Sequence, residues 1–219
     1  MDRIEIIEKW IKSKLNQDFK VVPASSDASF RRYFRIISNN KTYILMDAPP
    51  DLERIDHFIN ITNKLVNAEI NAPKIISFDT ELGFILMTDF GSQTFLDVLD
   101  SNNSRNLYSK AIHSLLEIQT KVDIKGLQDY SEDLLLGEML LFPEWYLAKF
   151  KKFKLEDQAV VHEIFSLISK KTLTQNKCFI HRDYHSRNLM FIEEDNLGIL
   201  DYQDAVVGPL TYDLVSLLK

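Results

Sequence analysis

The sequence predicts an α+β protein of two lobes, with a small antiparallel-sheet lobe over residues 1–88 and a mainly helical lobe over residues 89–219. Three observations predict this division. Short apolar runs separated by polar turns fill the first part of the chain. Apolar residues recur at helical spacing from Thr94 onward. Within this helical part lies a strand–loop–strand segment, residues 178–200, whose loop is polar.

The individual elements follow from the spacing of the apolar residues. An opening helix is expected over residues 4–15 and a second over residues 52–66. The strands of the first lobe are expected at residues 19–22, 30–37, 42–46, 75–78 and 84–87. Helices are expected over residues 94–99, 107–118, 134–150 and 160–168, with a last helix from Thr211. We expect the aromatic residues of the third of these helices to pack in its core; they are Phe142, Trp145, Tyr146 and Phe150.

The loop between the strands of the helical lobe carries the strongest functional signal. Asp183 and Asn188 stand five residues apart, in the pattern H-R-D-x-x-x-x-N that begins at His181, and Asp201 ends the next strand. This pattern is the catalytic loop of phosphoryl transfer. Asn188 and Asp201 suit a hard cation such as Mg²⁺, which leaves Asp183 to accept a proton from a hydroxyl.

Two other interpretations of this segment remain open. It could be an ordinary hairpin stabilised by Asx turns. Alternatively, His181, Asp183 and His185 could be the metal ligands of a hydrolase. The joint match of the loop pattern and a strand-terminal aspartate favours phosphoryl transfer over both.

A small polar turn, residues 24–29, separates the first two strands of the sheet. Its backbone N–H groups and hydroxyls could approach phosphate oxygens, as a glycine-rich loop does, although serine-rich turns are commonly turns alone. We therefore predict Ser26, Ser29 and Arg32 as nucleotide ligands. A kinase would place a lysine near the end of the third strand, but Met46 holds that position. Arg32 or Arg35 could supply the positive charge that a lysine would bring to the phosphates. A nucleotide-binding pseudoenzyme, which lacks this charge, is a further alternative.

The signature Asp89-Phe90-Gly91 spells a metal-binding motif but lies far upstream of the catalytic loop, whereas the metal aspartate should follow that loop. We predict instead that residues 87–89 form the hinge between the lobes, where the backbone of Met87 and Asp89 binds an adenine edge. For Glu53, a solvated carboxylate is the preferred interpretation over an ion pair with a sheet arginine.

The spacing after the catalytic loop points to a small acceptor. Only residues 202–212 separate Asp201 from Asp213, which leaves no room for the activation loop and peptide-docking segment of a protein kinase. We predict that Asp213 folds back to bind amides of the catalytic loop.

The composition excludes several other classes of protein. A formal net charge of −6 argues against a nucleic-acid-binding surface. The single cysteine excludes a disulfide framework and a cysteine-based zinc site. No apolar run reaches membrane-spanning length, and the first residues do not resemble a signal peptide, so we expect a soluble cytoplasmic protein that engages neither membrane nor nucleic acid.

The chain resembles the aminoglycoside phosphotransferase and choline kinase superfamily. Within it, residues 25–35, 46–50 and 200–209 are similar to those of the bacterial anomeric N-acetylmuramate/N-acetylglucosamine kinases, and the likeness covers essentially the whole chain. The resemblance implies a protein-kinase-like fold, ATP and Mg²⁺ as cofactors, and phosphorylation of the C1 hydroxyl of an amino sugar in cell-wall recycling. The partner it implies is this small sugar substrate.

By position, the resemblance makes Asp183 the base, Asn188 and Asp201 the Mg²⁺ ligands and residues 87–89 the hinge. It also makes a methionine at position 46 normal for the subfamily. Members of this family extend well past the position of Lys219, and the last helix lacks a capping glycine or asparagine, so we expect the helical lobe to be incomplete and activity of this chain to be low.

Overall fold

The computed structural model describes residues 2–26, 30–153, 157–193 and 196–219. The chain forms two compact units, which are described separately. The sheet unit comprises residues 1–111 and 186–203, and the helical unit comprises residues 112–185 and 204–219. The lobe boundary predicted at residue 88 stays a sequence-based prediction.

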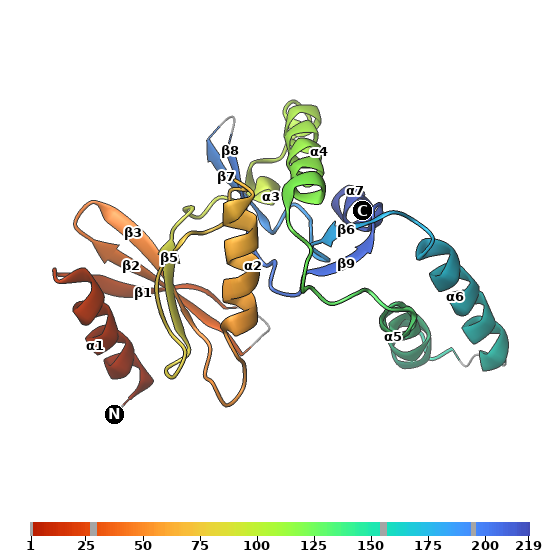
Figure 1. Ribbon diagram of the computed structural model, residues 1–219, viewed down its shortest axis with the longest axis horizontal. Helices are drawn as coiled ribbons and strands as arrows, with labels where there is room; N and C mark the ends of the chain where they lie inside the picture. The colour runs from red at the N-terminus through yellow and green to blue at the C-terminus, as the bar shows by residue number, and fades with distance from the viewer. Residues whose placement is uncertain (1, 27–29, 154–156, 194–195) are drawn as a thin grey trace. The chain divides into compact units, whose positions relative to one another are not determined.

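The sheet unit is built on one five-stranded antiparallel sheet with the strand order β1-β2-β3-β5-β4 (Figure 1). All five predicted strands are present, which confirms the antiparallel sheet of the α+β fold. The prediction that the first strand ends at Val22 is wrong, because β1 continues through Pro23 to Ser26, with a register shift between Pro23 and Ser25, into the segment predicted as a turn. Their bounds are β1 Lys20–Ser26, β2 Arg32–Ser38, β3 Lys41–Asp47, β4 Ile75–Asp79 and β5 Phe84–Thr88.

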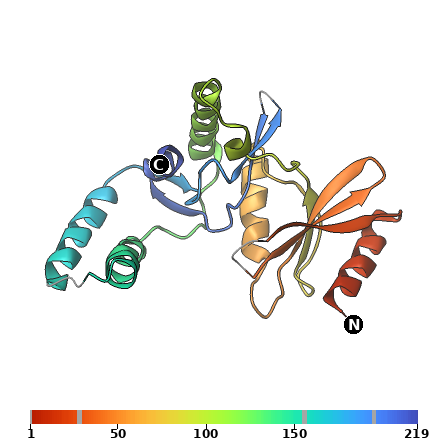
Figure 2. The same ribbon diagram turned by 180° about the vertical axis from the view of Figure 1, so that it is seen from behind.

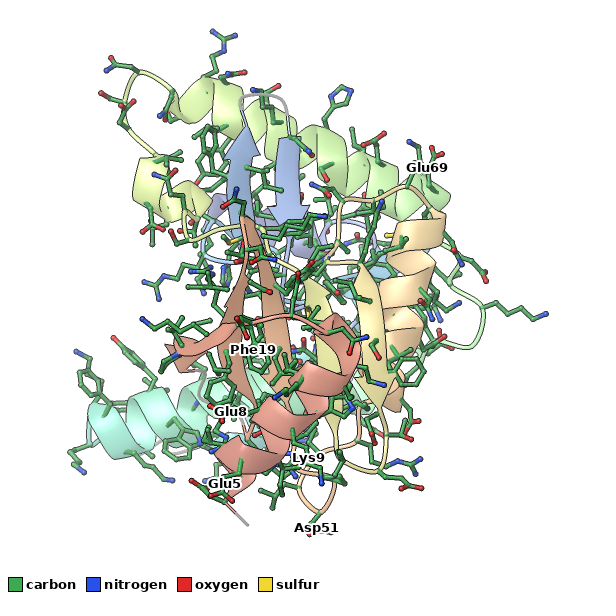
Figure 3. All side chains as sticks on the ribbon, turned by 90° about the vertical axis from the view of Figure 1, so that its left-hand side faces the viewer. Glu5, Glu8, Lys9, Phe19, Asp51 and Glu69 are labelled. Carbon is green, nitrogen blue, oxygen red and sulfur yellow. The ribbon has the colours of Figure 1, made fainter. Side chains whose placement is uncertain are left out.

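Two helices lie on opposite faces of this sheet, α1 (Arg3–Leu15) and α2 (Asp56–Asn67) (Figures 1 and 2). The apolar stripe of α1 packs on side chains from β2, β3 and β5 and forms a core with them. The outer side of α1 carries Glu5, Glu8 and Lys9, which are exposed (Figure 3). The helical period thus buries one stripe and leaves a charged one in water.

Strand alternation decides which side chains of β2 face α1. Phe34 and Ile36 are buried against that helix. Because successive side chains point to opposite faces, Tyr33 and Arg35 face the other side of the sheet. Arg32 shares the α1 side and pairs with the buried carboxylate of Asp47.

The sheet unit also contains a short helix, α3 (Phe95–Val98), and a strand pair, β7 (Leu189–Glu193) with β8 (Asn196–Ile199). The side chain of Thr94 caps α3 by accepting a hydrogen bond from the backbone N–H of Asp97. A β-bridge from Thr94 to Met190 joins this segment to the strand pair.

The helical unit contains most of α4 (Ser104–Lys121), which enters it from the sheet unit, followed by α5, a π-helix, α6, β6, β9 and α7. Strands β6 and β9 form an antiparallel pair, of which β9 was not predicted. Across the described stretches of the chain, no helix is long and apolar enough to cross a membrane. The bounds are α5 Glu132–Leu141, η1 Phe142–Phe150, α6 Gln158–Thr172, β6 Lys177–Ile180, β9 Val206–Pro209 and α7 Tyr212–Leu218.

The predicted burial of the aromatic residues in η1 is wrong. Phe142, Trp145, Tyr146 and Phe150 are 52%, 57%, 46% and 72% exposed. The spacing of four residues places Phe142, Tyr146 and Phe150 on one helix face, where their rings stack on one another at 5.4 and 5.8 Å between centroids. A spacing of four residues brings side chains to one face of a helix, but it does not specify whether another element covers that face.

The hairpin between β4 and β5 generates a stability prediction at Gly83. This residue has φ +70°, and a Cβ placed on it would lie 1.8 Å from the carbonyl oxygen of Ala48. We expect Gly83→Ala to destabilise the protein by about 1–3 kcal/mol beyond the left-handed backbone cost, because backbone atoms must move to relieve the clash. The measurement is urea unfolding of the purified variants.

Gly91→Ala is the matched control. Gly91 has φ +86° in the same unit, but a Cβ placed on it would meet no other described atom within 4 Å. Gly91→Ala should lower the free energy of unfolding only by the cost of the left-handed backbone conformation, about 1–2 kcal/mol. Equal losses for the two variants would contradict the steric argument.

Candidate functional site

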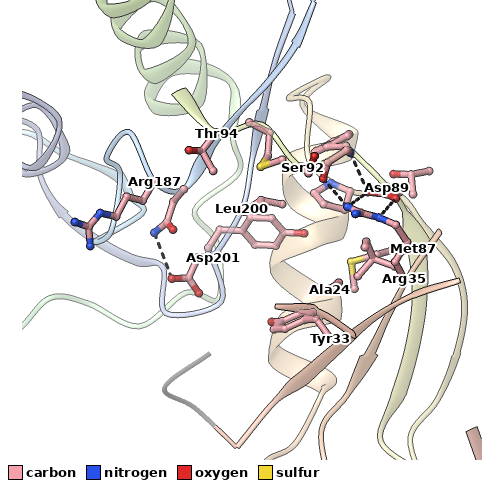
Figure 4. Close-up of a pocket in the computed structure, with 18 of the residues that line it drawn as sticks. Ala24, Tyr33, Arg35, Met87, Asp89, Ser92, Thr94, Arg187, Leu200 and Asp201 are labelled. Carbon is pink, nitrogen blue, oxygen red and sulfur yellow. Dashed lines mark hydrogen bonds and ion pairs between the residues drawn. The ribbon is translucent and has the colours of Figure 1, made fainter. Parts of the chain in front are cut away.

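A cavity of about 390 Å³ opens on the sheet face opposite α1, entirely within the sheet unit (Figure 4). Its apolar lining includes Ala24, Ile44, Met87 and Leu200. Polar residues gather toward its ends, as is typical of a site that holds a flat apolar group and fixes its polar substituents. Among them are Tyr33, Arg35, Asp89, Asn188 and Asp201.

At one end of the cavity, Asp89 and Arg35 form a two-point ion pair. Arg35 donates from Nε to Oδ2 of Asp89 at 2.6 Å and from its terminal nitrogen to Oδ1 at 3.1 Å. The same guanidinium donates to the carbonyl of Gly91 at 2.7 Å, and the Gly91 N–H donates back to Asp89 at 2.9 Å. The segment from Met87 to Gly91 is therefore fixed to β2.

Another side of the cavity holds Asp201 (Figure 4), and Asn188 is its neighbour there. The amide nitrogen of Asn188 lies 3.3 Å from Oδ2 of Asp201, and the N–H of Leu200 donates to the Asn188 carbonyl at 2.9 Å. Gln203 donates from its amide to Oδ1 of Asp201 at 2.8 Å. An amide oxygen and a carboxylate are ligands that suit Mg²⁺, and the Asn188 amide, whose nitrogen faces Asp201, would have to turn its oxygen toward Asp201 to join such a site.

Asp201 adopts a left-handed backbone, with φ +62°. For a residue other than glycine this conformation costs about 1–2 kcal/mol and persists only where neighbouring contacts fix it. The next residue, Tyr202, provides these contacts. Its buried ring stacks on Phe58 of α2 at 5.3 Å, and its hydroxyl lies 3.0 Å from the Thr62 hydroxyl. The sequence reasoning missed both Tyr202 and Gln203, although their positions directly after a candidate metal ligand were a usable signal.

In the helical unit, the loop that follows β6 is held by Asp213 of α7. The Asp213 carboxylate accepts the N–H of His181 at 2.7 Å and the N–H of Arg182 at 3.0 Å. This confirms the prediction that Asp213 folds back onto the loop. Arg182 is left-handed, with φ +76°, and the following residue, Asp183, is exposed. The loop thus presents the Asp183 side chain from a braced turn.

The hydrolase interpretation of the same loop has no support in its geometry. The His181 ring is fully buried, lies edge-on to Tyr184, and accepts the Asp183 N–H at Nδ1, 3.3 Å away. Within the described residues, no group of three or more His, Cys, Asp and Glu side chains is arranged to hold a metal ion. The proposed ligands His181, Asp183 and His185 all lie in this described part.

The structure brings four of the residues predicted for the site to one cavity, namely Met87, Asp89, Asn188 and Asp201. Asp183 belongs to the helical unit. Arg32 lies outside the cavity lining, on the α1 side of the sheet, where it donates to Asp47 at 2.5 Å. Ser26 ends β1, but its side chain, like the whole of Ser29, lies outside the described residues.

The positions of Met46 and Glu53 also bear on the site. Met46 is fully buried in β3 between Tyr33 and Ile85, so a core side chain occupies the place expected for a lysine. Glu53 forms an ion pair with the buried Arg31, which makes the preferred interpretation of a solvated carboxylate wrong.

Comparison with known proteins relates this chain to phosphotransferases. Residues 20–219 match the model of the phosphotransferase enzyme family. The chain is 43% identical to the N-acetylmuramate/N-acetylglucosamine kinase of Pseudomonas aeruginosa, over 99% of this chain and 68% of that protein.

Two solved structures have the same fold. The choline kinase LicA from Streptococcus pneumoniae superposes with a TM-score of 0.71 at 17% identity, over 98% of this chain and 73% of that one. The streptomycin–ATP complex of the aminoglycoside phosphotransferase APH(2")-IIa superposes with a TM-score of 0.64 at 14% identity, over 96% and 74% of the two chains. At these identities the likeness establishes the protein-kinase-like fold.

The burial of Asp213 generates a prediction about pH. Burial raises the pKa of its carboxyl to about 7, against the opposing effect of the two loop amides, and the charge of Asp183 adds to the rise. The folded state therefore holds this proton more tightly than the unfolded chain, and the contribution of Asp213 to the free energy of unfolding falls as pH rises from about 4 to about 7. The expected fall is on the order of 4 kcal/mol.

The measurement is urea unfolding of the protein and of Asp213→Asn between pH 5 and pH 8. Asparagine does not titrate, so the stability advantage of the original protein over this variant should shrink as pH rises. A difference that stays constant with pH would contradict the raised pKa.

Proposed function

Because the chain belongs to the phosphotransferase enzyme family, we propose that it transfers the γ-phosphoryl group of ATP to the anomeric hydroxyl of an amino sugar, N-acetylmuramate or N-acetylglucosamine. The observation that carries this proposal is the cavity that brings the predicted hinge together with Asn188 and Asp201. The substrate assignment is supported by the name of the Pseudomonas aeruginosa relative, which is 43% identical.

The cavity supports ATP as the phosphoryl donor. Its apolar lining from Ala24, Ile44, Met87 and Leu200 suits a purine ring. Since the Asp89 carboxylate is occupied by Arg35, the hinge offers backbone groups rather than this side chain to the base. Ser26, Ser29 and Arg32 stay part of the proposal as phosphate ligands, although Arg32 would have to leave Asp47 to act as one.

Asn188 and Asp201 are the residues proposed to hold Mg²⁺. Magnesium bound there would neutralise charge on the phosphates during transfer. The Gln203 amide fixes one oxygen of Asp201 at 2.8 Å, and Tyr202 fixes the left-handed backbone beside it. Asp201 is therefore oriented before a cation arrives.

Asp183 is the proposed base. In this role its carboxylate orients the sugar hydroxyl and accepts its proton as the oxygen bonds to phosphorus, and ADP leaves. The loop pattern supports this role for Asp183. The exposed position of Asp183, at a turn that Asp213 and the left-handed Arg182 fix, also supports it. The short connection over residues 202–212 supports a small acceptor rather than a protein.

A nucleotide-binding pseudoenzyme is the second candidate, because the place expected for a phosphate-binding lysine holds the buried Met46. It would bind ATP with Mg²⁺ and turn over no acceptor. Measuring ADP release from ATP with N-acetylmuramate separates the two candidates, since only the kinase gives acceptor-dependent release.

For the base, we expect Asp183→Asn to lower kcat by about 10²–10⁴-fold, because the amide cannot accept the hydroxyl proton. The Kd for ATP should change little, since this side chain is not proposed to hold the phosphates. Steady-state kinetics and isothermal titration with ATP measure the two quantities. Asp129→Asn, an exposed carboxylate of the same unit, is the control. Parallel loss of ATP binding and activity would indicate a metal-ligand role instead.

For the metal site, we expect Asp201→Ala to abolish the Mg²⁺ dependence of nucleotide binding, and Asn188→Ala to weaken it less, because only the first removes a charged ligand. Titrating Mg²⁺ against a fluorescent ATP analogue measures this dependence. Asp51→Ala, which removes an exposed carboxylate of the same unit, should leave it unchanged. Retention of the full Mg²⁺ dependence in Asp201→Ala would refute the assignment.

A further inference from the structure

Helix α5 contributes a carboxylate to the catalytic loop that the loop pattern does not include. Glu138 accepts a hydrogen bond at Oε1 from the guanidinium of Arg182 at 2.5 Å. Its other oxygen, Oε2, accepts the hydroxyl of Tyr130 and, at 3.2 Å, the hydroxyl of Tyr212. Both oxygens of Glu138 are therefore engaged, and one of them holds the residue directly before Asp183.

The two tyrosines fix Glu138 in turn. Tyr130 is fully buried, and its ring meets that of Tyr212 edge-on at 5.3 Å. Burial raises the pKa of the Tyr130 hydroxyl, and its hydrogen bond to Glu138 adds to the rise, so it remains protonated and donates. Two neutral donors and one cation thus surround the carboxylate, and all three depend on Glu138 as their shared acceptor.

Arg182 depends on this carboxylate for its charge balance. Its side chain is 26% exposed, and it lies over the Tyr130 ring at 5.8 Å. Burial acts to lower the pKa of Arg182, but the hydrogen bond and charge of Glu138 outweigh it and the net pKa is raised. Without Glu138, this guanidinium would have to find another carboxylate or turn toward water.

A second carboxylate, Asp204, also raises the pKa of Arg182, although less than Glu138 does. A guanidinium released from Glu138 would be drawn toward Asp204, and the turn that leads to Asp183 would lose its side-chain anchor. Arg182 also has a left-handed backbone, which needs contacts on both its main chain and its side chain to persist. Asp213 supplies the first contact and Glu138 the second.

We propose that Glu138 is a positioning residue for phosphoryl transfer, which acts through Arg182 to fix the turn that presents Asp183. This inference rests on the proposed function, because positioning has a catalytic consequence only if Asp183 is the base. Glu138 itself touches no reacting atom in this assignment.

The kinetic test uses Glu138→Gln, which keeps the shape of the side chain and removes its charge. We expect kcat for N-acetylmuramate phosphorylation to fall about 10–100-fold, because the base is displaced from its productive position. KM for ATP should stay within about twofold, since the nucleotide residues lie in the sheet unit. Glu138→Asp, which restores the charge on a shorter side chain, should recover part of the loss.

Glu132→Gln is the matched control. Glu132 lies on the same helix and also pairs with a cation, Lys170, at 3.9 Å, but its hydrogen bond comes from Ser166 of α6 rather than from the catalytic loop. It should leave kcat unchanged. A kcat that falls equally in both variants, or a KM for ATP that rises in step with the loss of kcat in Glu138→Gln, would overturn the positioning role.

Amide hydrogen exchange at His181 and Arg182 tests the same inference without using activity. We expect about tenfold faster exchange of these two amides in Glu138→Gln than in Glu132→Gln, since the turn loses one of its two anchors. Unchanged exchange would overturn the proposal. If the original protein shows no sugar kinase activity, the proposed function fails, and the exchange result still decides whether Glu138 fixes the turn.

Discussion

The loop that follows β6 depends on the hydrogen bonds that the backbone N–H groups of His181 and Arg182 donate to the buried Asp213 carboxylate. A loop that leaves a strand and turns through a left-handed residue exposes amides that no ladder can satisfy, and a buried unsatisfied amide costs about 1–3 kcal/mol. One carboxylate with two oxygens satisfies two such amides at once. The cost is the burial of Asp213, which is reflected in its raised pKa.

The same physical solution recurs in the sheet unit at Asp89. The Asp89 carboxylate accepts hydrogen bonds from the Gly91 N–H and from two nitrogens of Arg35. It therefore fixes the backbone turn and also neutralises the guanidinium. In both units an aspartate near the candidate chemistry serves the backbone rather than a substrate. In the proposed function, the group that meets the substrate is then a neighbour of this aspartate, namely Asp183 in one unit and the backbone of Met87 in the other.

Periodicity predicted the five strands, the helices and the fold class, because buried faces impose regular spacing on the sequence. It could not predict the side of the sheet on which Arg32 lies, since that depends on strand parity relative to the core residue Phe34. Strand β9 was missed because it ends in Gly208 and Pro209, residue types that commonly mark a turn rather than a strand. The contacts of Glu138 were beyond the sequence, because the 44-residue separation between it and Arg182 carries no local signal of the pairing.

The placement of cations around the cavity adds support for the metal site. Among the described lining residues, Arg35 is neutralised by Asp89, whereas the exposed Arg187 lies on the side of the cavity that holds Asp201 (Figure 4). The position where a kinase carries a sheet lysine holds the buried Met46. In the proposed function, Mg²⁺ held by Asn188 and Asp201 would supply positive charge that neither Arg35 nor Met46 offers to the phosphates. Tyr202 and Gln203 hold Asp201 in place for that proposed role.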